Sequence, residues 1–199
     1  MDTKEKIIQV AFNLFLQRGY KEVSLKQIVD AVGLTKGAFY HHFTGKEQLF
    51  RQIVNIYLLE GGEKVYDDLP KDNLKQFMVS YLERVVAFMD RVQQEIYDSD
   101  KKMGISYFQL AFDGLHLFSD FPNKIMKIHE KERNTWIEVL QNARENGEIN
   151  THISDRQLAR MFIGVNDGLG MHLMLEGRFD DLQGEIFTMW NAIYNLIKT

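Results

Sequence analysis

Cationic and hydrogen-bonding side chains cluster between positions 24 and 46 of the sequence. Among them are Thr35, Lys36, Tyr40, His42 and Lys46. Thr35 precedes a short segment with helical spacing, and an N-cap leaves neighbouring backbone N–H groups free to meet a phosphate. Lys36 adds a cation at the same end, and Gly37 lets another backbone approach closely. This pattern predicts recognition of a phosphate-bearing partner.

Three further polar side chains at 40–46 are also placed to contact a phosphate-bearing partner. Tyr40 and His42 carry hydrogen-bonding tips past the helix face, and Lys46 begins the next helix, where it is placed for a backbone phosphate. Phe39 and Phe43 have the spacing of core residues. Adjacent residues on a helix point about 100° apart, so His41 and His42 do not predict a metal site, and no metal ligand is assigned.

Two short helices joined by a tight turn must position these groups. Ser24 with Gln27 forms an S-x-x-Q capping box for a helix over 24–32, Gly33 ends that helix, and Thr35 begins the next. This is the layout of a helix-turn-helix, whose second helix enters the major groove of DNA. An amphipathic helix from Asp2 or Thr3 to Gly19 precedes it.

The rest of the chain also reads as helical. A fourth helix runs from Lys46 into the mid-60s, weakened at Gly61-Gly62, and further helices are predicted over 74–96, 103–118, 125–146, 158–175 and 182–197. The segment 98–102 is a polar break. Because strand alternation is absent, we predict an all-α fold of about nine helices. Residues 1–46 form the helix-turn-helix domain, and residues 47–199 form a ligand-binding and dimerisation domain.

Composition narrows the class of protein. The chain has 199 residues, 45% of them hydrophobic and 26% charged, which excludes a disordered protein. It has no Cys, so disulfides and thiolate chemistry are excluded. No apolar run reaches the ~20 residues that span a bilayer, and the N-terminus alternates in charge unlike a signal peptide. These features predict a cytoplasmic protein.

The net charge of −4 is unevenly distributed. Residues 1–57 hold eight Lys or Arg and five Asp or Glu, which gives +3, and the remainder carries −7. A basic head on an acidic body predicts two roles, with the head as the only surface attractive to phosphate.

Residues 1–60 resemble the DNA-binding domain of the TetR (tetracycline repressor) family of bacterial transcription regulators. The specific pattern is F-Y-x-H-F at 39–43 followed by K-E-x-L-F at 46–50, after a helix-turn-helix. The resemblance implies a homodimer that binds a pseudo-palindromic operator in double-stranded DNA, usually as a repressor, under the control of a small-molecule effector. The effector and the operator sequence stay open.

The resemblance also implies roles for single residues. Ser24 would touch a phosphate and Lys26 a base edge. The phosphate-contacting positions of the family correspond to Thr35, Tyr40, His42 and Lys46. The base-facing start of the recognition helix corresponds to Lys36, Gly37 and Ala38. Ser24 and Thr35 also serve as helix caps, and this role is compatible with a phosphate contact.

The predicted helix over 103–118 is rich in aromatic residues and apolar on most sides, so we expect it to be buried or to line a cavity. The candidate ligand-binding residues are Tyr81, Phe88, Met89, Tyr107, Phe108, Phe112, His116, Trp136 and Asn166. Plain core packing is the alternative for this set. For His116 and His172, a hydrogen-bonded place in the core is favoured over a ligand contact. The composition favours a partly apolar organic ligand, and no cofactor is assigned.

The C-terminal region predicts a dimer interface. Gly164, Gly168 and Gly170 lie within one helix, where each glycine costs ~1 kcal/mol, and this implies close approach of another helix. The final helix presents a broad apolar face. We expect residues 155–176 and 181–198 to pair with their symmetry mates in a four-helix interface.

Two other functions remain as alternatives. One is a helix-turn-helix regulator that is controlled by a protein partner or has no ligand, with a solid core in place of a pocket. The more distant one is a helical enzyme. The sequence lacks H-E-x-x-H, a phosphate loop, G-x-S-x-G and Cys, so no catalytic residue is assigned.

Overall fold

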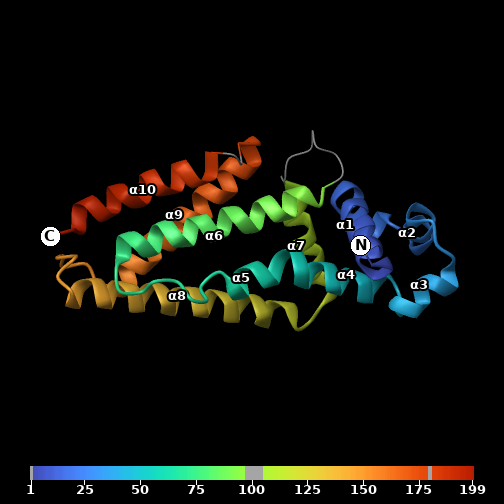
Figure 1. The fold of residues 1–199 in the computed structure, drawn as a ribbon, viewed down its shortest axis with the longest axis horizontal. Helices are drawn as coiled ribbons and strands as arrows, with labels where there is room; N and C mark the ends of the chain where they lie inside the picture. Colours follow the sequence, from blue (N-terminus) through green and yellow to red (C-terminus); the bar gives the residue numbers. More distant parts are fainter. Residues whose placement is uncertain (1, 97–104, 179–180) are drawn as a thin grey trace. The chain divides into compact units, whose positions relative to one another are not determined.

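The computed structural model describes residues 2–96, 105–178 and 181–199, and most of these residues are helical (Figure 1). Within the described ranges the only β-type pairing is an isolated bridge between Ile149 and Lys198. The all-α prediction is therefore confirmed. The predicted polar break at 98–102 and the first two residues of the predicted 103–118 helix lie outside the described residues.

The helices follow one another along the whole chain. They are α1 Thr3–Glu22, α2 Leu25–Val32, α3 Lys36–His42, α4 Lys46–Val54, the π-helical turn η1 Asn55–Leu59, α5 Glu60–Lys64, α6 Leu74–Gln94, α7 Ile105–Leu117, α8 Phe121–Glu145, α9 Asp155–Glu176 and α10 Leu182–Ile197. Because α4, η1 and α5 are continuous, the described residues form nine helical segments, as the sequence predicted. Gly19 interrupts α1 with φ of 76°, at the position where the sequence predicted its end.

The contacts divide the chain into two compact units. The first unit is Met1–Gly61 with Arg91–Lys124, and the second is Gly62–Asp90 with Ile125–Thr199. These units do not follow the predicted boundary between residues 46 and 47. The reason is that α4 and α7 both pack on α1, which brings them into the same unit as the helix-turn-helix.

Aromatic side chains hold the first unit together. The Phe12 ring of α1 stacks on Tyr57 with 3.8 Å between ring centroids, and the Phe15 ring meets Phe50 edge-on at 5.1 Å. Phe12, Phe15 and Phe50 are fully buried. The apolar stripe of α1 therefore packs against the helical segment that begins at Lys46.

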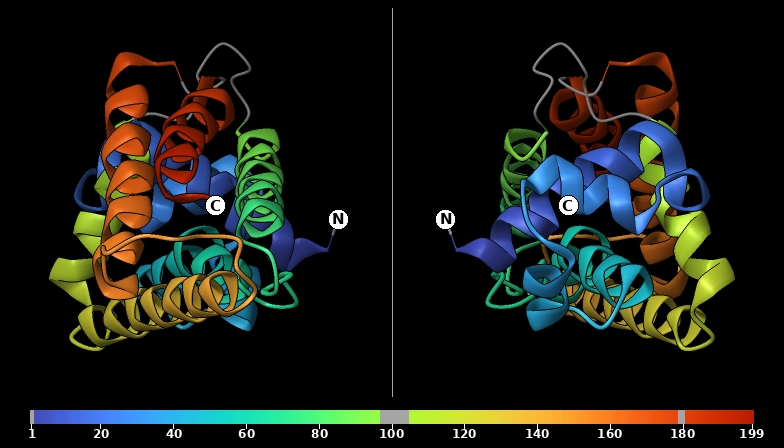
Figure 2. Two further views of the ribbon diagram at one scale, coloured as in Figure 1. Left: turned by 90° about the vertical axis from the view of Figure 1, so that its left-hand side faces the viewer. Right: turned by 90° about the vertical axis from the view of Figure 1, so that its right-hand side faces the viewer.

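The second unit has a separate aromatic core, centred on Trp136 of α8. Its ring stacks on Phe162 of α9 at 4.9 Å and meets Phe77 of α6 and Trp190 of α10 edge-on at 4.8 and 4.9 Å. The Trp190 Nε1 donates a hydrogen bond of 2.8 Å to the Phe162 carbonyl, which satisfies its only polar group. In this unit α9 and α10 lie side by side (Figure 2).

Candidate nucleic-acid interface

The turn between α2 and α3 has the local chemistry that a helix-turn-helix requires. Ser24 Oγ accepts a hydrogen bond of 3.2 Å from the Gln27 amide, and Gln27 Oε1 accepts one of 2.7 Å from the Ser24 amide. At the other end of α2, Gly33 adopts φ of 78° and ψ of 32°, and its amide donates to the Val29 carbonyl. A side chain would strain this left-handed conformation. The caps thus fix both ends of α2.

The packing of α3 determines which of its side chains reach solvent. Phe39 and the following Phe43 are each 1% exposed, which confirms them as core residues. Thr35 Oγ1 caps the helix by accepting a hydrogen bond of 3.2 Å from the Ala38 amide. With Phe39 turned inward, Lys36, Gly37 and Tyr40 are exposed. The start of α3 therefore presents a cation and backbone groups to any partner.

The nine predicted DNA-contacting residues all lie on α2, α3 and their caps or at the start of α4, in the first unit. The exposed ones are Ser24, Lys26, Thr35, Lys36, Gly37 and Tyr40, and the half-buried ones are Ala38, His42 and Lys46. The structure thus brings the whole predicted set into one unit. Contact with DNA itself stays a prediction.

Lys46 has a structural role that the sequence did not indicate. Its Nζ donates hydrogen bonds of 2.8 Å to the carbonyls of Tyr20 and Val23, and it lies 3.9 Å from the centroid of the Tyr20 ring. Burial lowers the pKa of Lys46, and Asp113 opposes this shift. Two of the three donors of this ammonium group thus tie α4 to the end of α1 and to its C-cap residue Val23.

Helix α7 supports the helix-turn-helix by packing on α1 and α4. Asp113, which is 8% exposed, accepts a hydrogen bond of 3.0 Å from the Tyr20 amide through Oδ2. The Tyr107 hydroxyl donates to the Tyr57 carbonyl in the π-helical turn. Beyond α7, Arg51 pairs with Asp120 at 2.7 Å. This supporting role of α7 was missed, because the partners are far apart in the sequence.

Four of the predicted ligand-binding residues lie on α7, and the structure does not gather them in an enclosed space. Tyr107 is buried and Phe108 half-buried, but Phe112 is 56% exposed and His116 is also exposed. The helix is therefore not buried, and its Ser106, Gln109, Asp113 and His116 instead line an open groove. It packs one face on α1 and α4 and leaves the other apolar face uncovered within the described residues. His116 and His172 are both exposed, so neither is a core histidine.

The other five predicted ligand-binding residues lie in the second unit. Tyr81 and Trp136 belong to its aromatic core, where they pack against Phe77 and Trp190. Phe88, Met89 and Asn166 are half-buried. Core packing, the alternative that the sequence left open, is thus what the structure shows for Tyr81 and Trp136. The nine residues are divided between the two units.

A buried carboxyl group near this core was not predicted. Glu132 of α8 is 8% exposed, and its Oε1 accepts a hydrogen bond of 2.6 Å from the Tyr66 hydroxyl. Burial raises the pKa of Glu132 to about 7, although the Tyr66 hydrogen bond acts in the opposite direction. No sequence signal separates Glu132 from the other charged residues of its amphipathic helix.

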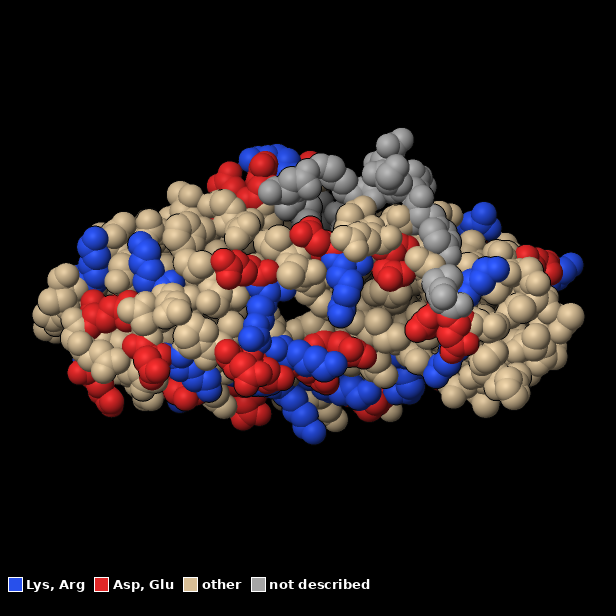
Figure 3. Space-filling model, in the orientation of Figure 1, with Lys and Arg blue, Asp and Glu red and all other residues tan. Residues whose placement is uncertain are grey.

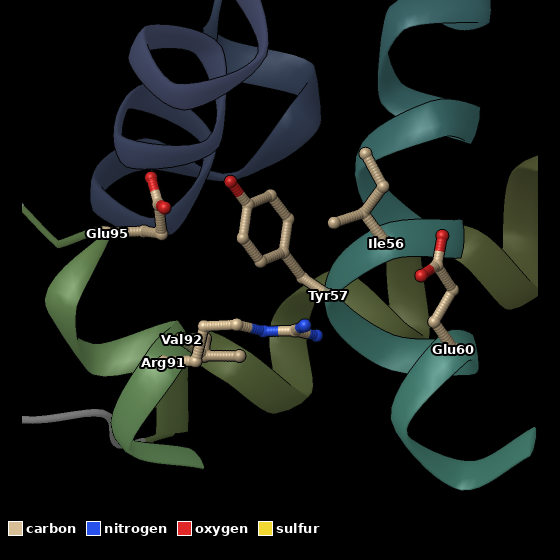
Figure 4. A pocket seen from close by; sticks show the side chains of 6 residues that line it. All are labelled: Ile56, Tyr57, Glu60, Arg91, Val92 and Glu95. Atoms are coloured by element: carbon tan, nitrogen blue, oxygen red, sulfur yellow. The ribbon is translucent and has the colours of Figure 1, made fainter. Parts of the chain in front are cut away.

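Two hollows of the first unit are lined by described residues and bear on the predicted ligand site. One is a pocket of about 250 Å³ formed by Ile56, Tyr57, Glu60, Arg91, Val92 and Glu95 (Figure 4). The other is a groove of about 640 Å³ between the end of α1 and α7, and His116 is one of its lining residues. His116 is thus the only predicted ligand-binding residue that lines either of these two.

Surface charges are mixed on the face shown in Figure 3, where basic and acidic side chains lie close together. Elsewhere in the described residues, opposite charges pair, as in Lys71–Glu138 at 2.7 Å and Lys131–Asp67 at 2.6 Å. Within the described part of the chain there is no group of three or more His, Asp or Glu residues placed to hold a metal ion. In the same part, none of the helices has the length and apolarity to cross a membrane.

Comparison with known proteins agrees with this geometry. Residues 7–53 match the family described as bacterial regulatory proteins, tetR family. The HTH-type transcriptional repressor KstR2 of Mycolicibacterium smegmatis is 25% identical over 162 residues, which cover 80% of this chain and 73% of KstR2. The HTH-type transcriptional repressor NemR of Escherichia coli is 21% identical over 192 residues, which cover 96% of this chain and 94% of NemR.

Solved structures show the same fold. The crystal structure of reduced E. coli NemR matches with a TM-score of 0.63 at 19% identity, covering 100% of this chain and 98% of that one. The flavonoid-responsive regulator FrrA matches with a TM-score of 0.57 at 16% identity, covering 98% of this chain and 97% of that one. The matched family and these relatives are transcriptional regulators rather than enzymes.

Proposed function

Because the chain belongs to the TetR family of bacterial transcriptional regulators and is a DNA-binding regulator of transcription, we propose that it acts as a homodimeric repressor. It binds a pseudo-palindromic operator in double-stranded DNA and leaves it when a small, partly apolar ligand binds. A regulator of bacterial genes works where the DNA is, in the cytoplasm.

The capped α2–α3 turn is the observation that carries this proposal. Its packing leaves Lys36, Gly37 and Tyr40 exposed at one face. We assign phosphate contacts to Ser24, Thr35, Tyr40, His42 and Lys46, and base contacts to Lys26 and to Lys36–Ala38. Phosphate contacts fix the position on the duplex and base contacts give specificity. With one long polar side chain at the start of α3, DNA shape contributes to operator choice.

Apolar side chains on two sides of α9 and α10 support the homodimer. One side faces the aromatic core of the second unit through Phe162 and Trp190. The other side leaves large apolar residues exposed, namely Met161, Met171, Leu175, Met189 and Leu196. A Cβ added at Gly164 or Gly168 would meet nothing within 4 Å. Within the described residues these glycines are open, which favours a second copy of the chain as the partner at 155–176 and 181–198.

Ligand control is proposed from the family. A ligand releases DNA only if it binds more tightly to a conformation that cannot engage the operator. The similar structure FrrA is described as flavonoid-responsive, which shows that this fold accommodates control by a small molecule in that protein. We propose that the continuous helical segment that begins at Lys46 transmits the effect of ligand binding to the helix-turn-helix.

Fluorescence anisotropy on the DNA upstream of the protein's own gene tests the proposal. We expect binding that is specific over a scrambled duplex and weakens steeply with salt, because phosphate contacts release counterions. Equal affinity for both duplexes would contradict the assignment of a specific operator. Light scattering at micromolar concentration is expected to give the mass of a dimer, and a monomer would contradict the proposed interface.

A further inference from the structure

An open groove of about 640 Å³ lies between the end of α1 and α7, two helices that lie side by side in the first unit (Figure 1). Most of its lining residues are polar or charged. Those of α1 include Gln17, Arg18 and Lys21, and those of α7 include Ser106, Gln109 and His116. The groove therefore suits a polar ligand rather than an apolar one.

The lining has an excess of positive charge. Arg18 and Lys21 are exposed on the α1 side, and within the described part of the chain neither side chain forms an ion pair or a hydrogen bond. Among the described lining residues, Asp113 is the only acidic one. Guanidinium and ammonium groups attract oxyanions, and the planar guanidinium can donate two parallel hydrogen bonds to one.

Asp113 does not cancel this excess, because its carboxylate already has partners. Its Oδ2 accepts a hydrogen bond of 3.0 Å from the Tyr20 amide, and its Oδ1 accepts one of 3.3 Å from Gln109 Nε2. Asp113 also interacts electrostatically with the ammonium group of Lys46. An anion in the groove thus meets two exposed cations, whereas the opposing carboxylate is buried and hydrogen-bonded.

We propose that this groove binds a small polar organic molecule with two negative charges on oxygen atoms, as in a dicarboxylate or a phosphate monoester. The two charges match Arg18 and Lys21, and the side chains of Gln17 and Ser106 can form hydrogen bonds with the rest of the molecule. The volume lies within the usual range for ligand pockets. Because the lining is polar, this is a second site, distinct from that of the partly apolar ligand proposed above.

The last turn of α1 connects the groove to the DNA-binding helices. Tyr20 donates its amide to Asp113, and its carbonyl accepts a hydrogen bond of 2.8 Å from Lys46 Nζ at the start of α4. Three positions after Lys21, Ser24 caps α2 and is assigned a phosphate contact above. A dianion at Lys21 repels a DNA phosphate at Ser24, so occupancy of the groove lowers operator affinity. This regulatory part rests on the proposed repressor.

Two sets of probes, each matched in shape and different in charge, test the chemistry by isothermal calorimetry on the full-length protein. Succinate, succinamate and succinamide form the dicarboxylate set, and glycerol 3-phosphate with glycerol forms the phosphate set. In at least one set we expect the dianion to bind about tenfold or more tightly than its neutral counterpart, and less tightly as salt is raised. The set with the larger difference identifies the class of ligand. Failure of both sets would overturn the proposal.

Substitutions with opposite expected effects locate the site. Arg18→Gln and Lys21→Gln each remove an attracting charge and should weaken binding of the preferred dianion about threefold to tenfold. Gln17→Lys adds a cation at an exposed lining position and should strengthen binding, an effect that misfolding cannot imitate. Lys6→Gln, at an exposed position of the same helix outside the groove, is the matched control and should leave binding unchanged. Weaker binding in Gln17→Lys, or an equal loss in Lys6→Gln, would overturn the assignment to this groove.

The effect on DNA is measured separately on the upstream duplex at constant ionic strength, because salt itself weakens DNA binding. Specific binding without a probe tests the proposed repressor and does not depend on the groove. A saturating concentration of the preferred dianion should lower operator affinity in the wild type. The same concentration should have less effect in Arg18→Gln with Lys21→Gln, where affinity is compared with that of the same variant without the probe. If operator binding is specific and the dianion leaves it unchanged, the regulatory part is wrong and the proposed repressor stands.

Discussion

Helices α3 and α7 both belong to the first unit and both bury aromatic side chains against it, but their outward faces differ. On α3, Phe39 is buried and the exposed side carries Lys36 and Tyr40. On α7, Tyr107 is buried and the exposed side carries Phe112, Leu115 and Leu117. The inward residues explain packing in both cases. The outward residues differ: those of α3 suit contact with water and phosphate, whereas those of α7 suit an apolar environment.

Removing an inward anchor should have the largest effect. Phe39→Ala leaves a cavity at the only fully buried position of α3 and should lower the free energy of unfolding by about 3–5 kcal/mol. Because Phe39 orients the whole helix, specific operator binding should be lost as well. Urea denaturation followed by circular dichroism measures the first effect, and anisotropy measures the second. Retained stability together with full DNA binding would contradict the anchoring role.

The outward face of α3 should affect DNA binding without affecting stability. Lys36→Ala removes the exposed cation at the start of α3 and should weaken operator binding by about 1–3 kcal/mol. It should also relax base preference at one operator position. Lys127→Ala, at an exposed position of α8, is the matched control and should leave DNA affinity unchanged. An equal loss in both variants would show that only net charge matters.

These first two predictions rest on signals that the sequence contained. Ser24 with Gln27, Gly33 and Thr35 fix short helices through contacts between residues three or four apart, so local spacing was enough to place them. The role of Lys46 depends on carbonyls 26 and 23 positions earlier, and that of Asp113 on an amide 93 positions earlier. Such roles could not be predicted, because helical periodicity does not identify the distant surface against which a face packs.

The contact between α7 and α1 should have a smaller effect on stability. Asp113→Ala removes the acceptor for the Tyr20 amide and should cost about 1–2 kcal/mol of unfolding free energy, the usual cost of a buried donor left without a partner. Asp113→Asn keeps a side-chain carbonyl at this place and should restore most of the loss. If the Asn variant is as unstable as the Ala variant, the charge of Asp113, rather than its hydrogen bond, supports α1.

The outward face of α7 should have the smallest effect, and this result would sharpen the contrast with α3. Phe112 is 56% exposed, so Phe112→Ser removes little buried surface and should change the free energy of unfolding by less than about 0.5 kcal/mol. Leu110→Ser, on the buried face of the same helix, should be severely destabilising because it places a hydroxyl at a fully buried position. Chemical denaturation at several protein concentrations compares the two. A large loss in Phe112→Ser that grows with protein concentration would mean that another copy of the chain covers this face, and α7 would then contribute to assembly as well as to support.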